Sequence, residues 1–206
     1  LKRMIKKIII LLLFVIFCVT CGSHNSTVFL NNDYRKIHRK ALCDPKKPFP
    51  QMVIIPYFNR ASQIMPNCKT YPVGEVALAF FIFYHQWLEY FGDDNLAIRG
   101  MLEKVMIQWD TKKKVGVRGF DLDGKRIAEN RYVIGLVETK NMIWLWQGYN
   151  HKISESALIH ELVHLSLIAI NGHGDSDHEG FQYRGWTKRH TNMIIEAKQM
   201  LRAFEL

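Results

Sequence analysis

The sequence predicts an α+β domain, because three helical segments flank a run of strand-like segments. Apolar residues recur at three- and four-residue steps over Val73–Phe91, and Gly92 follows as a stop signal. From Lys104 onward the pattern changes to that of strands. Helical periodicity returns over Ser156–Ile170 and again over Thr187–Phe204. The expected order is a helix, a small mixed or antiparallel sheet, a second helix, a loop and a closing helix.

The strand-like segments differ in strength. Lys104–Asp110 is a clear candidate, and Val115–Phe120 is a weaker one. Arg131–Glu138 and Asn141–Gln147 are separated by two residues, which is typical of a β-hairpin. Gln51–Thr70 shows no clear period, and we expect this segment to wrap over the core, fixed by a bond between Cys43 and Cys68.

The N-terminus has the pattern of an export signal. Four basic residues precede the apolar run Ile8–Val19, which is too short to span a membrane comfortably, and we interpret 1–20 as a signal peptide. Cys21 is followed by Gly and Ser, as at a bacterial lipoprotein cleavage site, so we expect lipidation of Cys21. The alternatives are simple cleavage with secretion and an uncleaved anchor. We expect a tether and irregular lead-in over 21–50 and a single domain over 51–206.

The charge of the chain argues against a nucleic-acid partner. The formal net charge is +9, but four of the 28 basic residues lie in the leader. The remaining 24 basic and 19 acidic residues leave a net charge of +5, which is mild and diffuse. We therefore expect a protein of the bacterial cell envelope, attached to a membrane through the lipid anchor, or else periplasmic or secreted.

Cysteine usage predicts one disulfide. Removal of the leader leaves Cys21, Cys43 and Cys68. If Cys21 carries lipid, two thiols remain in an exported chain, and such a pair is usually oxidised. We expect a Cys43–Cys68 disulfide, with two unrelated buried thiols as the alternative.

The motif His160-Glu161-Leu-Val-His164 carries most of the functional information. Residues four apart share one face of a helix, so both imidazoles can bind one ion, with Glu161 beside them to act on a metal-bound water. With nine His and ten Glu in 206 residues, chance would produce this pattern only ~0.02 times. The sequence therefore predicts a zinc site with His160 and His164 as ligands.

The third ligand has several candidates. A catalytic zinc takes three protein ligands and leaves one position open for water. We favour His178, fourteen residues after His164, with His173, Glu196 or an Asp as alternatives. Asp175 and Asp177 are more suited to shaping this loop or orienting a ligand imidazole.

At this point the chain resembles the zincin metallopeptidases of the SprT-like kind. Those proteins have an HExxH helix, a third His in a Gly-bearing loop about fourteen residues on, and then an aromatic residue. The segment Gly174-Asp-Ser-Asp-His178 followed by Trp186 is also similar to small bacterial lipoproteins with HExxH and a GD-x-DH loop. The resemblance implies a zincin-like fold, His178 as third ligand and Glu161 as base. It departs at His178-Glu-Gly-Phe181, which is one residue shorter than the SprT pattern.

These observations predict an exported, lipid-anchored zinc metallopeptidase acting on a protein or peptide substrate. The segment Met142–Gln147 is expected to be an edge strand that pairs with an extended substrate. Tyr183, Arg184, His190 and His173 are candidate oxyanion stabilisers. The main alternative is a non-catalytic zinc-containing envelope binding or assembly protein, and another is a zinc enzyme acting on a non-peptide bond.

Overall fold

The computed structural model describes residues 43–68, 73–92, 96–117, 130–146, 157–174 and 185–204. The expected signal peptide and the lipidation site at Cys21 lie outside these residues. No helix within the described ranges combines the length and the apolar character that a membrane crossing requires.

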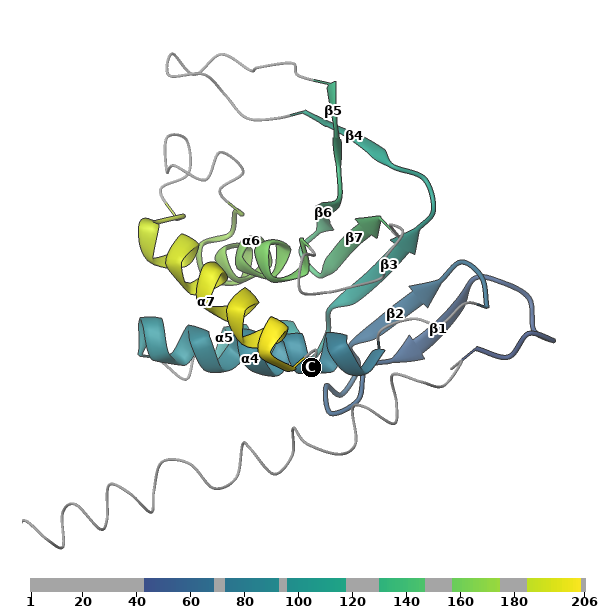
Figure 1. The fold of residues 1–206 in the computed structure, drawn as a ribbon, viewed down its shortest axis with the longest axis horizontal. Coiled ribbons are helices and arrows are strands. Elements are labelled where there is room, and N and C mark those ends of the chain that lie inside the picture. Colours follow the sequence, from purple (N-terminus) through teal and green to yellow (C-terminus); the bar gives the residue numbers. More distant parts are fainter. Residues whose placement is uncertain are drawn as a thin grey trace, which may run out of the picture.

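The chain folds as a mixed α+β domain, as its sequence predicts. In chain order the elements are β1 (Gln51–Ile54), β2 (Ser62–Met65), α4 (Val73–Phe91), α5 (Leu96–Leu102), β3 (Met106–Asp110), β4 (Lys114–Val117), β5 (Asn130–Val133), β6 (Gly135–Thr139), β7 (Met142–Trp146), α6 (Leu158–Asn171) and α7 (Lys188–Phe204). Figure 1 shows this arrangement.

The main sheet is mixed, with the strand order β1-β2-β3-β7-β6. The three inner strands β2, β3 and β7 are parallel, whereas β1 and β6 run antiparallel to their neighbours. The helices α4 and α5 connect β2 to β3, and a crossover of this kind is what a parallel pair requires. The two outer strands are joined to their neighbours by short connections, which produce antiparallel pairs.

The expected hairpin is present, but two of its features were predicted incorrectly. The predicted strand Arg131–Glu138 is divided between β5 and β6, which belong to different sheets, and the edge strand is not the one expected. β6 pairs with β7 so that Leu136 lies opposite Trp144. β7 also pairs with β3, so β7 is an inner strand and β6 forms the edge of the sheet. The three central residues of β7 are all buried, from Ile143 to Leu145. A strand covered on both faces has such a continuous apolar run, and this pattern indicates an inner strand.

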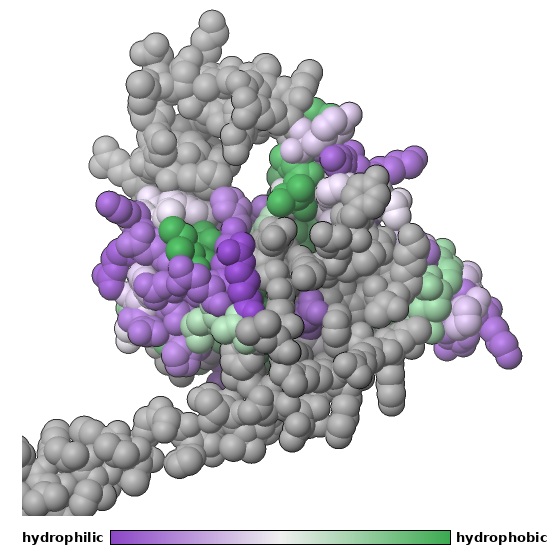
Figure 2. Space-filling model, viewed as in Figure 1, coloured by the Kyte–Doolittle hydropathy of each residue, from purple (hydrophilic) through white to green (hydrophobic). Residues whose placement is uncertain are grey.

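A second, two-stranded sheet projects from the body of the domain, at the top of Figure 1. Its strand β4 corresponds to the weaker strand that the sequence predicts, and it pairs antiparallel with β5. Val115 lies opposite Tyr132, and both side chains are exposed. Ile134 and Leu136 continue this exposed face along the chain, and Figure 2 shows green, apolar surface in this part of the molecule.

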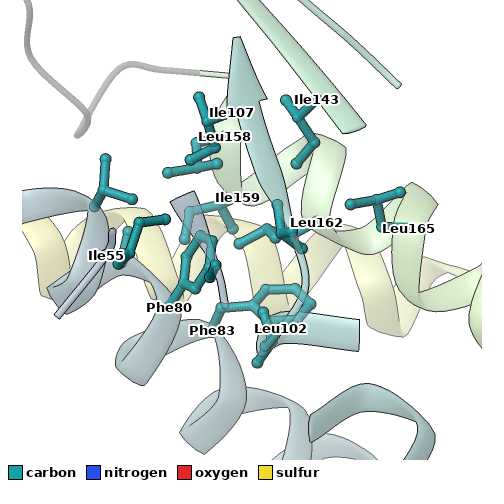
Figure 3. Close-up of a cluster of buried hydrophobic side chains, with 14 of the residues drawn as sticks. Ile55, Phe80, Phe83, Leu102, Ile107, Ile143, Leu158, Ile159, Leu162 and Leu165 are labelled. Carbon is teal, nitrogen blue, oxygen red and sulfur yellow. The ribbon is translucent and has the colours of Figure 1, made fainter. Parts of the chain in front are cut away.

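The core forms where α6 packs between the sheet and the other helices. α6 contacts β6 and β7, and it also contacts α4, α5 and α7. Figure 3 shows Phe80 and Phe83 of α4 pointing toward Ile159 and Leu162 of α6, and all four side chains are fully buried. The helix that carries the HExxH motif is thus held on several sides by apolar contacts. Such packing fixes the backbone from which the motif side chains project.

The segment before α4 contains regular structure that the sequence analysis missed. The strands β1 and β2 both lie within Gln51–Thr70, where the sequence shows no clear period. β2 begins with Ser62 and Gln63, two polar residues that are nevertheless buried, so its hydrophobic pattern is weak. The disulfide between Cys43 and Cys68 is present, as predicted, and it joins the lead-in to the chain that follows β2.

Candidate metal centre

The helix α6 places the two motif histidines side by side. The Nε2 atoms of His160 and His164 are 3.2 Å apart, and their ring centroids are 4.9 Å apart. The i, i+4 spacing on a helix produces this proximity. The two rings thus lie side by side, and the binding of one ion by both stays a prediction.

The end of α6 turns the chain back toward His164. Gly172 has a φ of +83°, and its backbone N–H donates to the Ile168 carbonyl at 2.9 Å. This is the left-handed helix ending that glycine favours, as expected for this position. Two residues later, the carbonyl oxygen of Gly174 lies 2.5 Å from Nδ1 of His164.

The contact with Gly174 determines which ring nitrogen of His164 carries the proton and which has the lone pair. A carbonyl oxygen can only accept, so Nδ1 of His164 must carry the proton and donate it. In the neutral ring, Nε2 then has a lone pair, and this is the atom that faces His160. A metal-binding histidine commonly has its other nitrogen held in this way. The close approach depends on Gly174, because a Cβ there would lie 3.3 Å from the His164 carbonyl.

Glu161 is held in a buried position between α6 and the edge of the sheet. It is only 6% exposed, and its carboxylate accepts a hydrogen bond from the backbone N–H of Val137 on β6. Burial raises the pKa of Glu161 to about 8, and the hydrogen bond from Val137 opposes this rise. Without a cation nearby, the carboxyl group therefore holds its proton more tightly than an exposed glutamate does.

Trp186 covers the histidine pair. Its ring lies 5.1 Å from the His160 ring and 4.9 Å from the His164 ring, measured between centroids. The indole N–H donates to the hydroxyl oxygen of Thr191 at 3.0 Å, and Trp186 is 6% exposed. The sequence analysis names this tryptophan only as part of a resemblance, and its contact with the histidine pair is visible only in the structure.

His190, one of the candidate oxyanion stabilisers, lies near the start of α7 and packs against neighbouring residues there. Its ring stacks on Phe91 at 4.5 Å, and its Nδ1 accepts the backbone N–H of Thr187 at 3.0 Å. Burial lowers the pKa of His190 to about 4, so the ring is neutral at pH 7. This arrangement resembles a capping box with histidine in the third helical position. The candidates Tyr183 and Arg184 lie outside the described residues.

The third ligand is not established by the described part of the chain. His178, Asp175 and Asp177 all lie outside the described residues. Within the described ranges, which include His173, no three His, Cys, Asp or Glu side chains form a group that could hold a metal ion.

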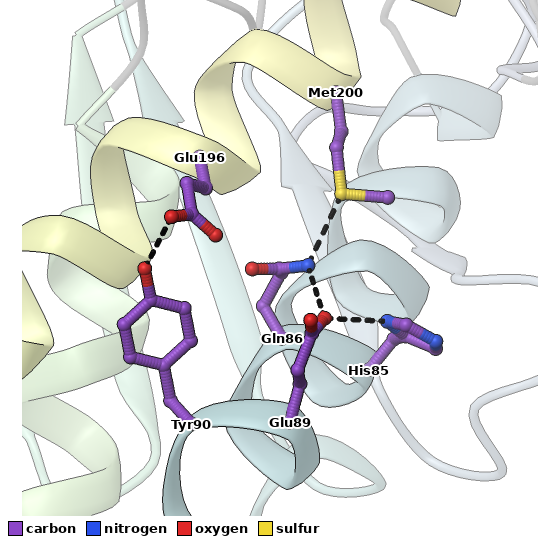
Figure 4. Close-up of polar contacts among 6 residues, drawn as sticks. All are labelled: His85, Gln86, Glu89, Tyr90, Glu196 and Met200. Carbon is purple, nitrogen blue, oxygen red and sulfur yellow. Dashed lines mark hydrogen bonds and ion pairs between the residues drawn. The ribbon is translucent and has the colours of Figure 1, made fainter.

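The alternative ligand Glu196 lies elsewhere on the molecule. Its carboxylate is on the exposed side of α7 and accepts a hydrogen bond from the hydroxyl of Tyr90 at 2.5 Å. Figure 4 shows this contact beside a second group, in which the Gln86 amide donates to Glu89 and contacts the sulfur of Met200. The Tyr90–Glu196 and Gln86–Met200 contacts link α4 to α7. The structure thus gives Glu196 a role between helices and does not bring it to the histidine pair.

No protein-family model matches the chain, and no curated protein or solved structure matches it.

Proposed function

We propose that this chain is a zinc-dependent metallopeptidase with a zincin-like fold, in which His160 and His164 bind the metal and Glu161 is the general base. The observation that carries the proposal is the 3.2 Å separation of the two Nε2 atoms. Two nitrogens bound to one tetrahedral zinc at 2.0–2.1 Å are about 3.3 Å apart. The donor atoms present therefore fit the ion.

The surroundings of the pair support a metal site. Nδ1 of His164 donates to the Gly174 carbonyl, which leaves Nε2 available and fixes the ring orientation. A hydrogen bond between the two rings would give a similar distance, so metal binding itself must be measured. Metal binding and a histidine–histidine hydrogen bond predict different zinc contents, because the hydrogen bond needs no zinc.

The described residues on either side of 175–184 lie at the histidine pair. Gly174 contacts His164, and Trp186 covers both rings. His178 lies between these two anchors in the sequence, within four residues of Gly174. This placement supports His178 as the third ligand, and the implied set leaves one coordination position for water.

The chemistry follows from the position of Glu161. Zinc, when bound, supplies a Lewis acid and lowers the pKa of a bound water toward ~7. Glu161 takes a proton from the attacking water and passes it to the leaving amine. A nearby cation favours the ionised carboxylate and so offsets the effect of burial on its pKa. Within the described residues, β6 forms the edge of the sheet and lies next to Glu161. An extended peptide can pair with the outward backbone groups of β6 that Glu161 does not occupy.

The fold and the disulfide are compatible with this function. The HExxH helix packs against a mixed sheet, as the zincin-like arrangement requires. The disulfide between Cys43 and Cys68 supports export, because such bonds persist in oxidising compartments. Lipidation at Cys21 remains part of the proposal on the basis of the sequence.

The test combines zinc binding with cleavage. The purified protein is expected to hold about one zinc per chain, and His160→Ala or His164→Ala is expected to abolish it. His85→Ala is the matched control, because His85 lies on the exposed side of α4. Full zinc content in His164→Ala would refute the metal site.

Glu161→Gln then separates the enzyme from a zinc-binding structural protein. This variant keeps the size of the side chain and removes its basicity. It is expected to retain zinc and to lose about 10²–10⁴ in the rate of peptide-library cleavage. A zinc-loaded wild-type protein that cleaves no peptide, in the library or in a proteome-wide search for new termini, would instead support the non-catalytic envelope protein.

A further inference from the structure

The backbone of β6 alternates between groups that bind β7 and groups that point to the open edge. The N–H of Trp146 donates to the carbonyl of Ile134 at 3.0 Å, so these two residues form a hydrogen-bonded pair. Pairs of this kind recur at every second residue in an antiparallel ladder, which makes Leu136 and Trp144 the next one. Consequently the N–H of Val137 points away from β7.

Glu161 occupies this outward donor. Its carboxylate accepts the Val137 N–H, although Glu161 belongs to α6 and Val137 to the edge strand. The contact satisfies a backbone group that the edge would otherwise leave without a protein partner. It also fixes the direction of a side chain that has three rotatable bonds.

Gly135 provides the space for this contact. A Cβ at position 135 would lie 2.3 Å from Cβ of Ala157 and 2.9 Å from Oε1 of Glu161. Real Cβ atoms essentially never show contacts as short as the first of these. Because both Ala157 and Glu161 are on α6, a side chain at position 135 would push the helix and the strand apart.

We propose that Gly135 and Val137 are positioning residues for Glu161, with Gly135 permitting the close approach of α6 and the Val137 amide holding the carboxyl group. This inference rests on the proposed function. The edge strand thereby has two tasks, because it borders the peptide site and also orients the base. Orientation of a general base by a fixed donor is a known source of catalytic efficiency.

The contact can be tested without any assay of cleavage. In the ¹⁵N-labelled protein, hydrogen exchange of the Val137 amide is expected to be at least ~10-fold faster in Glu161→Ala and in Gly135→Ala than in wild type. The Leu136 amide faces β7 and is expected to keep its protection, which shows that the hairpin is intact. Gly100→Ala is the matched control, because a Cβ at position 100 has nothing within 4 Å.

The positioning role is tested by kinetics on the zinc-loaded protein. Gly135→Ala is expected to lower kcat by at least ~10-fold with little change in KM or zinc content. Unchanged Val137 exchange in Glu161→Ala, or wild-type kcat in Gly135→Ala, would overturn the positioning role in an active enzyme. A wild-type protein without cleavage would overturn the proposed function and, with it, the catalytic meaning of the contact.

Discussion

Replacement of Trp186 by alanine is expected to affect both the stability of the domain and its affinity for zinc. Trp186 is 6% exposed and covers the rings of His160 and His164. Removal of a buried tryptophan costs about 3–5 kcal/mol of unfolding free energy. For a chain of this size, that loss lowers Tm by roughly 6–20 °C. The hydrogen bond to Thr191 adds little, because Thr191 is exposed and water can replace its partner.

The effect on zinc follows from the position of Trp186 at the end of the segment that carries His178. Without the indole ring, this end loses its contact with the histidine pair, and we expect the Kd for zinc to rise by ~10-fold or more. Denaturant unfolding and zinc titration measure the two effects separately. Trp186→Phe keeps an aromatic ring over the pair and is expected to retain most of the zinc affinity.

The control for Trp186→Ala is Leu201→Ala. Leu201 is 3% exposed on α7, and its loss is expected to cost about 2–5 kcal/mol as well. That variant is expected to bind zinc with the wild-type Kd, because Leu201 lies near the C-terminal end of α7, whereas Trp186 lies just before its N-terminal end. If Trp186→Ala is destabilised by less than ~1 kcal/mol, or if both variants bind zinc equally well, the structural reasoning about Trp186 is wrong.

Four further predictions concern the fold around the site. Leu162→Ala is expected to lower the free energy of unfolding by about 3–5 kcal/mol, measured with denaturant, because this motif residue is fully buried. A loss below ~1 kcal/mol would contradict the packing. Gly172→Ala is expected to lower the free energy of unfolding by about 1–2 kcal/mol from the positive φ alone, because a Cβ there meets nothing within 4 Å. Reduction of the Cys43–Cys68 bond, which closes a separation of 25 residues, is expected to lower stability by about 3.5 kcal/mol, measured by unfolding with and without reductant. His190 has a folded-state pKa of about 4, below the ordinary 6.5. Its contribution to stability is therefore complete above pH 6.5 and declines by up to about 1.4 kcal/mol per pH unit as the pH falls toward 4. His190→Gln is expected to flatten this decline in the free energy of unfolding, and an unchanged slope would contradict the assignment.

The parts of the fold that the sequence predicts well are those with strong local periodicity. The helix over Val73–Phe91 has the bounds that its apolar stripe indicates, and the closing helix starts one residue later than expected. The strands β1 and β2 are only four residues long, so they offer too few residues for a period to emerge. The seven-residue helix α5 was missed for the same reason.

For the site, the sequence predicts contacts that lie within one helix and misses those between elements. The spacing of His160 and His164 is sufficient to bring their Nε2 atoms together. By contrast, the contact of Glu161 with Val137 depends on which strand forms the edge of the sheet. That order is a tertiary property, and the sequence analysis assigned the edge to the wrong strand of the hairpin. The location of Glu196 beside Tyr90 likewise depends on how α7 packs on α4.

The strand order also determines which margin of the sheet lies near Cys43 and which lies near Glu161. Cys43, the first residue that the structure describes, is bonded to Cys68, which follows β2 on the side of the sheet where β1 forms the margin. Glu161 contacts the opposite margin, at β6. Four strand spacings separate the two margins, a width of about 19 Å. A pull applied at Cys43 would therefore load the disulfide-bonded margin first, while Glu161 lies at the far margin beside β6.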